Sequence, residues 1–218
     1  MINLNDLKEI IPILIVAASA LISLMIAVFS GKSKYPVYVF SLIAVLSAII
    51  FAGLNIGKDA FIISEMMRIN SVANAFHLIA LLSVLLTITA SKEYLEKFNV
   101  NYGEYYSLLL IALFGMQIMI YASDIILIFI GLETMSVCFY ILAGMMRQRP
   151  KSNESAMKYL LLGAFMTGFL LYGMSLIYGA TGYTSIAKII TTYTAFKSPM
   201  FLIGVALFMF GFMYKIGI

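Results

Sequence analysis

Seven long stretches of apolar residues dominate the sequence and constrain its fold more than any motif does. They cover residues 9–29, 37–56, 71–91, 105–122, 124–146, 155–179 and 199–218. About 20 apolar residues in a helix cross the hydrocarbon of a bilayer. The stretches lack the alternation of barrel strands and are about twice as long as such strands. We therefore predict an all-α fold, a polytopic transmembrane helix bundle of about seven spans.

The composition excludes a soluble domain. Of the 218 residues, 63% are hydrophobic and 11% are charged, whereas soluble domains carry about 25% charged residues. The first apolar stretch is too long for a signal-peptide core and lacks a small-residue cleavage pattern, so we interpret it as the first span. The net charge of +4 comes from cations scattered through short loops, which does not indicate binding to nucleic acid.

The loops between the spans predict the topology. Only Ser123 and Asp124 separate the fourth and fifth spans, which predicts a tight antiparallel pair, and residues 179–199 read as a long amphipathic loop. The loops on one side carry seven cations: Lys32, Lys34, Lys92, Lys97, Arg147, Arg149 and Lys151. Those on the other side carry five: Lys8, Lys58, Arg68, Lys188 and Lys197. The positive-inside rule makes the first side cytoplasmic and places the N-terminus in the periplasm.

Two ionisable residues of opposite sign, Glu133 and Lys215, lie inside apolar stretches. Each costs about 2.5–3.5 kcal/mol at the bilayer centre on insertion scales. At a rise of ~1.5 Å per residue, Glu133 is ~13 Å along its helix from Asp124, and Lys215 is ~24 Å from Pro199. The two side chains could therefore meet. Such a pair either exchanges protons or is a static ion pair that fixes helix register, and both interpretations stay open here.

Polar residues recur along one face of the fifth predicted helix. Steps of three and four connect Glu133, Ser136, Tyr140, Gly144 and Arg147, and this spacing brings them to one side of a helix. A polar stripe at membrane depth has to face other protein or a water-filled cavity. We therefore expect this face to point into the bundle.

Other charged residues lie near helix ends. Glu154 and Lys158 are four residues apart, which indicates an ordinary ion pair at a helix entrance, with Ser152 and Asn153 supplying the helix cap. The alternative is that Lys158 relays protons between the cytoplasmic side and Glu133.

The remaining polar and small residues favour structural roles. Glu104 and Asp124 open the fourth and fifth predicted helices, where the helix dipole favours an acid. His77 has no second His, Cys or Asp beside it, so we expect a satisfied polar residue and not a ligand. Cys138 has no partner for a disulfide or a metal site. Glycines in the sixth helix (Gly163, Gly168 and Gly173) are expected to pack against neighbouring helices.

No phosphate-binding glycine loop, cysteine cluster, haem histidine pair or Ser/His/Asp grouping is found in the sequence. We therefore expect no redox centre, cofactor or metal ion in this chain.

Several segments resemble a known family, the N subunits of the proton-pumping NADH-quinone oxidoreductase, complex I. The similar segments are Glu104–Leu110, Gly131–Ser136, Tyr140–Gly144, Ser152–Phe165, Phe169–Gly173, Tyr178–Gly182 and Gly211–Ile216. The resemblance is strongest over residues 104–182 and weaker over residues 1–103. The sister subunits L and M and the related cation/proton antiporters share a lysine that matches Lys158, but the residues that follow it differ from those in this sequence.

The resemblance implies an antiporter-like proton channel in the membrane arm of the complex. It divides the chain into an N-terminal three-helix segment (1–103) and an antiporter-like half-channel (104–218). Glu133 matches the family's essential glutamate, Lys215 its partner lysine, and Lys158 the lysine of the sixth helix. Glu104, Glu154, Asp124, Ser136 and Tyr140 are possible accessory residues.

The same resemblance implies that NADH, flavin, iron–sulfur clusters and quinone are bound by other subunits. The implied partners are neighbouring antiporter-like and small hydrophobic membrane subunits, in the inner membrane of a bacterial cell. Quinone reduction elsewhere in the complex is expected to drive the proton transfer.

The chain departs from the family pattern in its length. Family members continue for about as many residues again, as a second, inverted repeat of helices, whereas this sequence ends at Ile218. We expect one half of an inverted-repeat fold that holds an input half-channel. The alternatives are a structural subunit that carries no protons and a subunit of a cation/proton antiporter.

Overall fold

The computed structural model describes residues 4–29, 35–63, 65–98, 100, 103–192 and 198–217, with side chains from Glu9 onward. Several residues of the topology prediction lie outside the described parts: Lys32, Lys34, Lys197, Ile218 and the side chain of Lys8.

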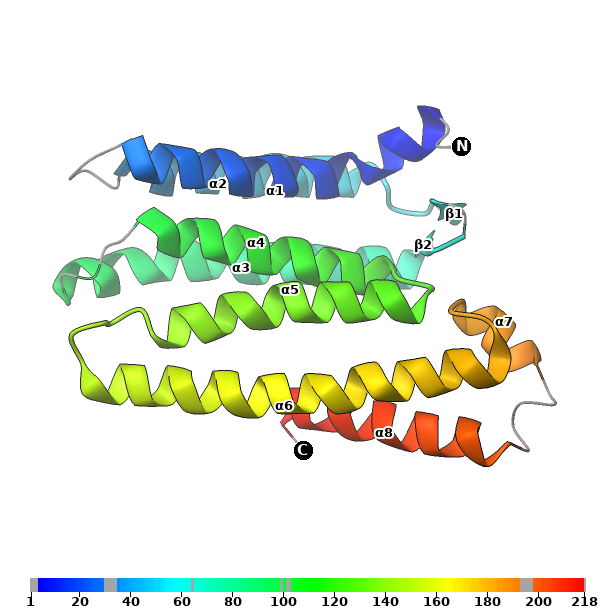
Figure 1. The fold of residues 1–218 in the computed structure, drawn as a ribbon. Helices are drawn as coiled ribbons and strands as arrows, with labels where there is room; N and C mark the ends of the chain where they lie inside the picture. The colour runs from blue at the N-terminus through cyan, green and yellow to red at the C-terminus, as the bar shows by residue number, and fades with distance from the viewer. Residues whose placement is uncertain are drawn as a thin grey trace.

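The described residues form seven long helices, as the sequence predicts. They are α1 (Leu4–Phe29), α2 (Tyr35–Gly53), α3 (Ser71–Lys97), α4 (Gly103–Tyr121), α5 (Ile125–Ala143), α6 (Pro150–Thr181) and α8 (Pro199–Ile216). Each is long and apolar enough to cross a membrane. Figure 1 shows them side by side in layers, with α1 and α2 outermost on one side, α3 and α4 next, then α5, and finally α6 with α8. The multi-pass helical prediction is confirmed.

Two small elements that the sequence analysis did not predict lie at one end of the bundle. A hairpin follows α2, with β1 (Ala60–Ile62) paired antiparallel to β2 (Met67–Ile69). A short helix, α7 (Ile186–Thr191), lies in the region predicted as a loop. Arg68 donates two hydrogen bonds to Asp59 beside the hairpin, which lowers the pKa of that carboxyl.

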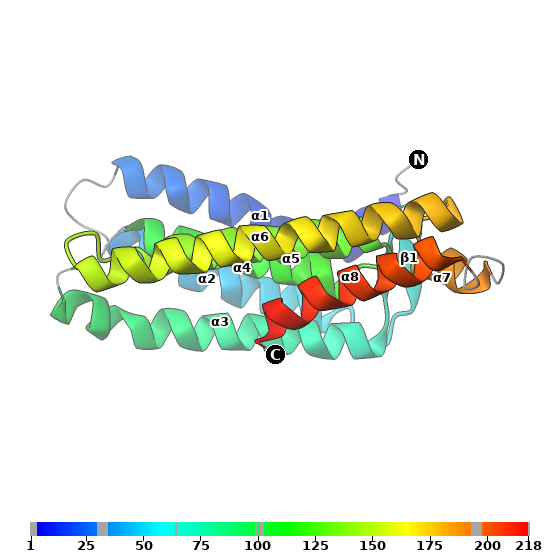
Figure 2. The same ribbon diagram turned by 60° about the horizontal axis from the view of Figure 1, so that its bottom comes forward.

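Backbone hydrogen bonds join three connections at this end. The Ser123 amide donates to the Met66 carbonyl (2.8 Å), and the Ile186 amide donates to the Ser123 carbonyl (3.1 Å). The Ile125 amide donates to the Thr184 carbonyl at 3.0 Å. The hairpin, the α4–α5 turn and the α6–α7 connection are thus held together by hydrogen bonds. In Figure 2, β1 and α7 lie at the same end of the bundle.

The described residues form three apolar clusters in the interior. The first is built by α1 to α4 and includes Leu81 and Leu110. The second is built mainly by α5 to α8 and includes Leu132 and Leu170. The third lies where α1 meets the hairpin and includes Ile69. Helix α4 belongs to the first cluster and also packs against α5. The division of the chain between residues 103 and 104 stays a prediction.

Glycines bring α4 and α5 into backbone contact. A Cβ atom on Gly131 would lie 2.6 Å from the Gly115 carbonyl oxygen, and a Cβ on Gly115 would lie 2.6 Å from the Gly131 carbonyl oxygen. The predicted tight pair is therefore confirmed. In α6, Gly173 packs against the Phe208 backbone of α8 as expected. Gly168 makes no such contact with the described residues, because beyond its chain neighbours and its own helix backbone none of their atoms lies within 4 Å of its Cβ position.

A buried polar cluster links α3 to α4. His77 is fully buried, and its ring nitrogens lie 2.8 Å from Gln117 Nε2 and 2.7 Å from the Tyr121 hydroxyl. Tyr121 donates in turn to Asn74 (2.9 Å). His77 is thus a satisfied polar residue, as predicted. Cys138 is a free, buried cysteine.

The glycine contact between α4 and α5 yields a stability prediction. We expect Gly131→Ala to lower the free energy of unfolding by about 1–3 kcal/mol, because the added methyl group has to displace α4 backbone. The measurement is thermal unfolding in detergent. Gly168→Ala is the matched control and should be at least as stable as the parent chain, because alanine favours a helix over glycine. Equal stability of the two variants would contradict the close contact.

Candidate functional site: a buried lysine–glutamate pair

The central feature of the bundle is an ion pair between α5 and α8. Lys215 Nζ lies 2.9 Å from Glu133 Oε1, and the two side chains are only 7% and 23% exposed. Glu133 lies within α5, and Lys215 lies in the last turn of α8, where the helix dipole favours a cation. The predicted meeting of the two groups is confirmed.

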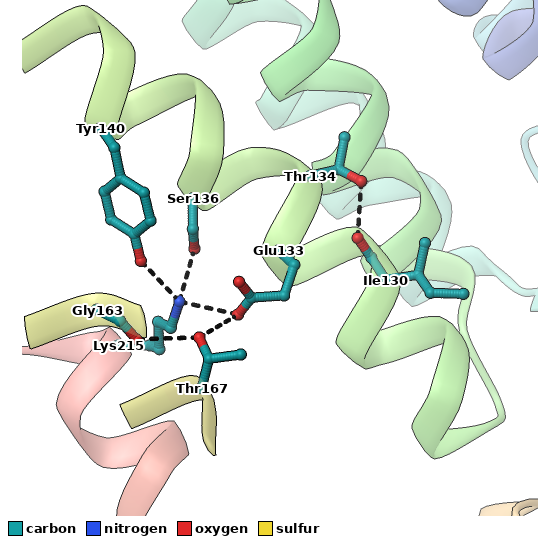
Figure 3. Close-up of polar contacts among 8 residues, drawn as sticks. All are labelled: Ile130, Glu133, Thr134, Ser136, Tyr140, Gly163, Thr167 and Lys215. Carbon is teal, nitrogen blue, oxygen red and sulfur yellow. Dashed lines mark hydrogen bonds and ion pairs between the residues drawn. The ribbon is translucent and has the colours of Figure 1, made fainter. Parts of the chain in front are cut away.

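Two hydroxyl groups complete the surroundings of the ammonium group. Lys215 Nζ donates to Tyr140 Oη at 2.9 Å and to Ser136 Oγ at 3.2 Å, in addition to Glu133. Figure 3 shows these three α5 side chains converging on the lysine. An ammonium group has three donors and no acceptor. Each N–H of a charged Lys215 therefore has one acceptor.

The polar stripe on α5 is confirmed for its inner part. Glu133, Ser136 and Tyr140 face Lys215, as their spacing predicts. Gly144 is the residue that caps α5 at its C-terminal end, and Arg147 lies beyond the helix and is exposed. The stripe on α5 therefore ends at the C-terminus of the helix, and Arg147 belongs to the exposed α5–α6 connection.

Sequence analysis missed Thr167, a fourth partner in the site. Its hydroxyl donates to Glu133 Oε1 at 2.9 Å and also lies 3.0 Å from the carbonyl oxygen of Gly163. The sequence signal that could have indicated Thr167 is a hydroxyl residue one turn after Gly163 in a largely apolar part of the sixth helix. A threonine commonly bonds its own helix in that position, so its contact across to α5 could not be inferred from spacing.

Helix ends and close contacts set the depth of the pair. Asp124 caps α5, because its side chain accepts from the Ile126 amide (2.8 Å) and from the Thr184 hydroxyl. The expectation that Asp124 opens α5 is confirmed, and Glu104 lies in the first turn of α4. On the α8 side, a Cβ on Gly211 would lie 2.9 Å from Leu170 Cβ. That close approach to α6 brings Lys215, one turn further along, to the level of Glu133.

The start of α6 differs in part from its prediction. Glu154 and Lys158 form the expected ion pair, with side chains 61% and 70% exposed. The prediction that Ser152 and Asn153 cap the helix is wrong. Helix α6 begins earlier, at Pro150, whose fixed φ suits a first helical position.

These two side chains instead join α6 to the preceding turn. The Ser152 hydroxyl donates to the Ala143 carbonyl (2.7 Å), and the Asn153 amide donates to the Arg147 carbonyl (3.0 Å). Lys158 is nine residues before Thr167, a rise of ~13 Å along α6. In this structure its ammonium group is bonded to Glu154 and not to the buried pair.

The arrangement combines a carboxylate, an amine and three hydroxyls in a site with little exposure. These groups can hold, accept or pass on a proton. Among the described residues, no group of three or more His, Cys, Asp and Glu could bind a metal ion.

Comparison with known proteins identifies similar chains. Residues 122–218 match the family model described as NADH:quinone oxidoreductase/Mrp antiporter, TM. The NADH-quinone oxidoreductase subunit N of Trichlorobacter lovleyi is 41% identical over 99% of this chain and 44% of its own length. The subunit N 1 of Chloroherpeton thalassium is 35% identical over 98% of this chain and 45% of its own length. The chain thus spans less than half the length of these curated relatives.

Solved structures agree on the fold. A chain of respiratory complex I from Thermus thermophilus, determined with bound aureothin, superposes with a TM-score of 0.76 and 26% identity, over 92% of this chain and 42% of that chain. A chain of the membrane-bound sulfane sulfur reductase, an archaeal respiratory membrane complex, superposes with a TM-score of 0.80 over 95% of this chain and 44% of that chain. At 24% identity, the second comparison supports the fold alone.

The buried pair leads to a second stability prediction. We expect Glu133→Leu to lower the free energy of unfolding by about 3 kcal/mol, because the Lys215 ammonium, whose side chain is only 7% exposed, loses its counter-charge. Glu133→Gln should cost less, since its amide oxygen still accepts from Lys215. Thermal unfolding in detergent distinguishes the two. The exposed pair supplies the control: Glu154→Gln should leave stability unchanged. If all three variants unfolded at the same temperature, the ion pair would not contribute to the stability of the fold.

Proposed function

Because the chain belongs to the family of NADH-quinone oxidoreductase N subunits, matching one of them over 99% of its length, we propose that it forms a proton-translocation half-channel in a respiratory NADH-quinone oxidoreductase. In this proposal the chain is a membrane-arm subunit of the enzyme complex and holds no redox centre. NADH, flavin, iron–sulfur clusters and quinone are bound by other subunits. The partners are neighbouring antiporter-like and small hydrophobic membrane subunits and the lipid bilayer.

The observation that carries the proposal is the ion pair of Lys215 and Glu133 at 2.9 Å inside the bundle. Two unit charges ~4 Å apart attract by about 4 kcal/mol at an effective dielectric of 20. Such an attraction holds the lysine charged while the glutamate is close and ionised. When the carboxylate is neutralised or withdrawn, the same lysine is left in a poorly solvated place and releases its proton more readily.

The transfer needs no group beyond these two side chains. A proton leaves Lys215 Nζ and binds a carboxylate oxygen of Glu133, which turns the ion pair into a neutral amine and a neutral acid. Reloading from one side of the membrane and release to the other then moves one proton. The Thr167 hydroxyl, which donates to Glu133, stabilises the carboxylate after Glu133 has released its proton.

We assign the remaining site residues supporting roles. Ser136 and Tyr140 accept from Lys215 and solvate its charge. Lys158 and Glu154 form the entry pair from which protons reach Glu133 through water. Glu104 and Asp124 act mainly by holding the ends of α4 and α5.

The proposed setting is the inner membrane of a bacterium, with the N-terminus in the periplasm. Arg147 and Arg149 lie in the α5–α6 connection, Lys151 lies in the first turn of α6, and Lys92 lies near the end of α3. The positive-inside rule favours the cytoplasm for that side.

The central test replaces the two charged groups in the membrane complex that contains this chain. We expect Glu133→Gln and Lys215→Ala each to lower proton pumping coupled to NADH oxidation at least about tenfold, since a positioned proton-transfer group contributes about 100-fold or more. Pumping is measured by dye quenching in inside-out membrane vesicles, and assembly by the amount of intact complex.

Thr134→Val is the matched control, because the Thr134 hydroxyl donates only to the carbonyl of Ile130 within the described part of α5. Figure 3 shows it pointing away from the pair. Normal pumping in both charge variants would favour a structural subunit instead. Sodium-dependent proton exchange in vesicles that lack NADH dehydrogenase would favour an antiporter.

A separate experiment tests Lys158. Arginine keeps a positive charge but does not release a proton in proteins. If Lys158 relays protons, we expect Lys158→Arg to slow pumping about as much as Lys158→Gln. If the lysine serves only as the ion-pair partner of Glu154, Lys158→Arg should pump normally. The measurement is the initial rate of vesicle acidification at matched amounts of complex.

A further inference from the structure

Gly163 lies where a side chain would collide with the Tyr140 hydroxyl. A Cβ atom built on Gly163 would lie 2.1 Å from Tyr140 Oη and 2.6 Å from its Cζ. Both residues are buried. The missing side chain therefore leaves the space on α6 in which the hydroxyl of α5 lies.

A second residue of α6 contacts the same phenol ring. Tyr159 packs edge-on against it, with ring centroids 4.7 Å apart and an interplanar angle of 87°. Tyr159 and Gly163 are one helical turn apart on α6, so the ring and its hydroxyl meet the same helix at successive turns. The hydroxyl in this position lies 2.9 Å from Lys215 Nζ.

The hydroxyl partners differ from Glu133 in what they can do for a neutral lysine. A charged Lys215 has three donors, whereas a neutral amine has two donors and one lone pair that accepts. Once Glu133 has passed the transferred proton on, it is ionised again and can only accept, while Lys215 is still neutral. A tyrosine or serine hydroxyl can both accept and donate, and it reverses by rotating its hydrogen without moving the oxygen.

Tyr140 is the closer of the two hydroxyls, at 2.9 Å against 3.2 Å for Ser136. It therefore supplies a hydrogen bond to Lys215 before and after the proton leaves. Without it, one donor of the charged lysine or the lone pair of the neutral one loses its partner, and a buried polar group without a partner is costly.

We infer that Gly163 is a positioning residue of the proton-exchange site: its bare Cα holds the Tyr140 hydroxyl against Lys215, where this hydroxyl is the reversible hydrogen-bond partner in both charge states of the lysine. The inference rests on the proposed function, since it requires Lys215 to change its charge during turnover. The Gly163 contact thus both packs α5 against α6 and positions the Tyr140 hydroxyl for the proton exchange.

The test uses Gly163→Ala, Tyr140→Phe and their combination in the complete membrane complex. We expect each single variant to slow proton pumping about five- to tenfold, the effect of one lost hydrogen bond. Each should also shift the pH profile of pumping in the same direction. The double variant should be no slower than the slower single variant, because both changes remove the same contact.

Gly168→Ala is the matched control on the same helix, because its Cβ position is open in the described part of the chain, with no atom beyond its own helix backbone within 4 Å. It should retain the parent rate and pH profile. The amount of assembled complex is measured for every variant, so that rates are compared per complex.

Three results would overturn the inference. One is a Gly163→Ala variant that pumps like Gly168→Ala. Another is a slow variant with an unchanged pH profile, which indicates a packing defect alone. The third is a double variant whose losses multiply. Because Glu133→Gln and Lys215→Ala test the proposed function without touching Gly163, failure of the inference can be told apart from failure of that function.

Discussion

The hydrocarbon interior of a membrane offers no hydrogen bonds, and this constraint governs the structure of the protein. Polar groups inside the spans therefore need protein partners. Lys215 meets the requirement with three acceptors on one helix, and His77 meets it with Gln117 and Tyr121. The two clusters nevertheless differ in kind. The histidine cluster is buried and joins an imidazole to amide and phenol groups, whereas the lysine site pairs an amine with a carboxylate and remains partly accessible through the Glu133 side chain, which is 23% exposed.

Close backbone contacts make this geometry possible. In lipid, helices are not driven together by the hydrophobic effect, so small residues at the crossing points determine how near they come. Gly131 brings α5 onto α4, Gly173 brings α6 onto α8, and Gly163 receives a side chain from α5. The three contacts align the helices that carry Glu133, Thr167 and Lys215. The functional groups of the site thus depend on residues that carry no functional group.

Sequence reasoning predicted the parts of the structure that follow from periodicity and depth. Apolar length gave the seven spans, and steps of three and four along α5 brought Glu133, Ser136 and Tyr140 to one face. It failed where contacts depend on tertiary geometry. Thr167 carries no distinctive spacing, and its contact with Glu133 arises from how α6 lies against α5.

Two local predictions also failed. The predicted start of α6 was wrong because Pro150 begins the helix, which leaves the side chains of Ser152 and Asn153 to bond the preceding turn. The hairpin was missed because strands of three residues are too short to show alternation.

The contact between Gly115 and Gly131 has a consequence for how charge can move in this bundle. Sliding α5 by one residue, about 1.5 Å, would bring a side chain to the place that Gly131 occupies against the α4 carbonyl. Helix α5 therefore cannot slide along α4, and the backbone of Glu133, two residues beyond the contact, keeps its position. Lys215 is carried on four methylene groups in the last turn of α8. The ion pair can therefore open by rotation about the side-chain bonds of Lys215, without a movement of α5.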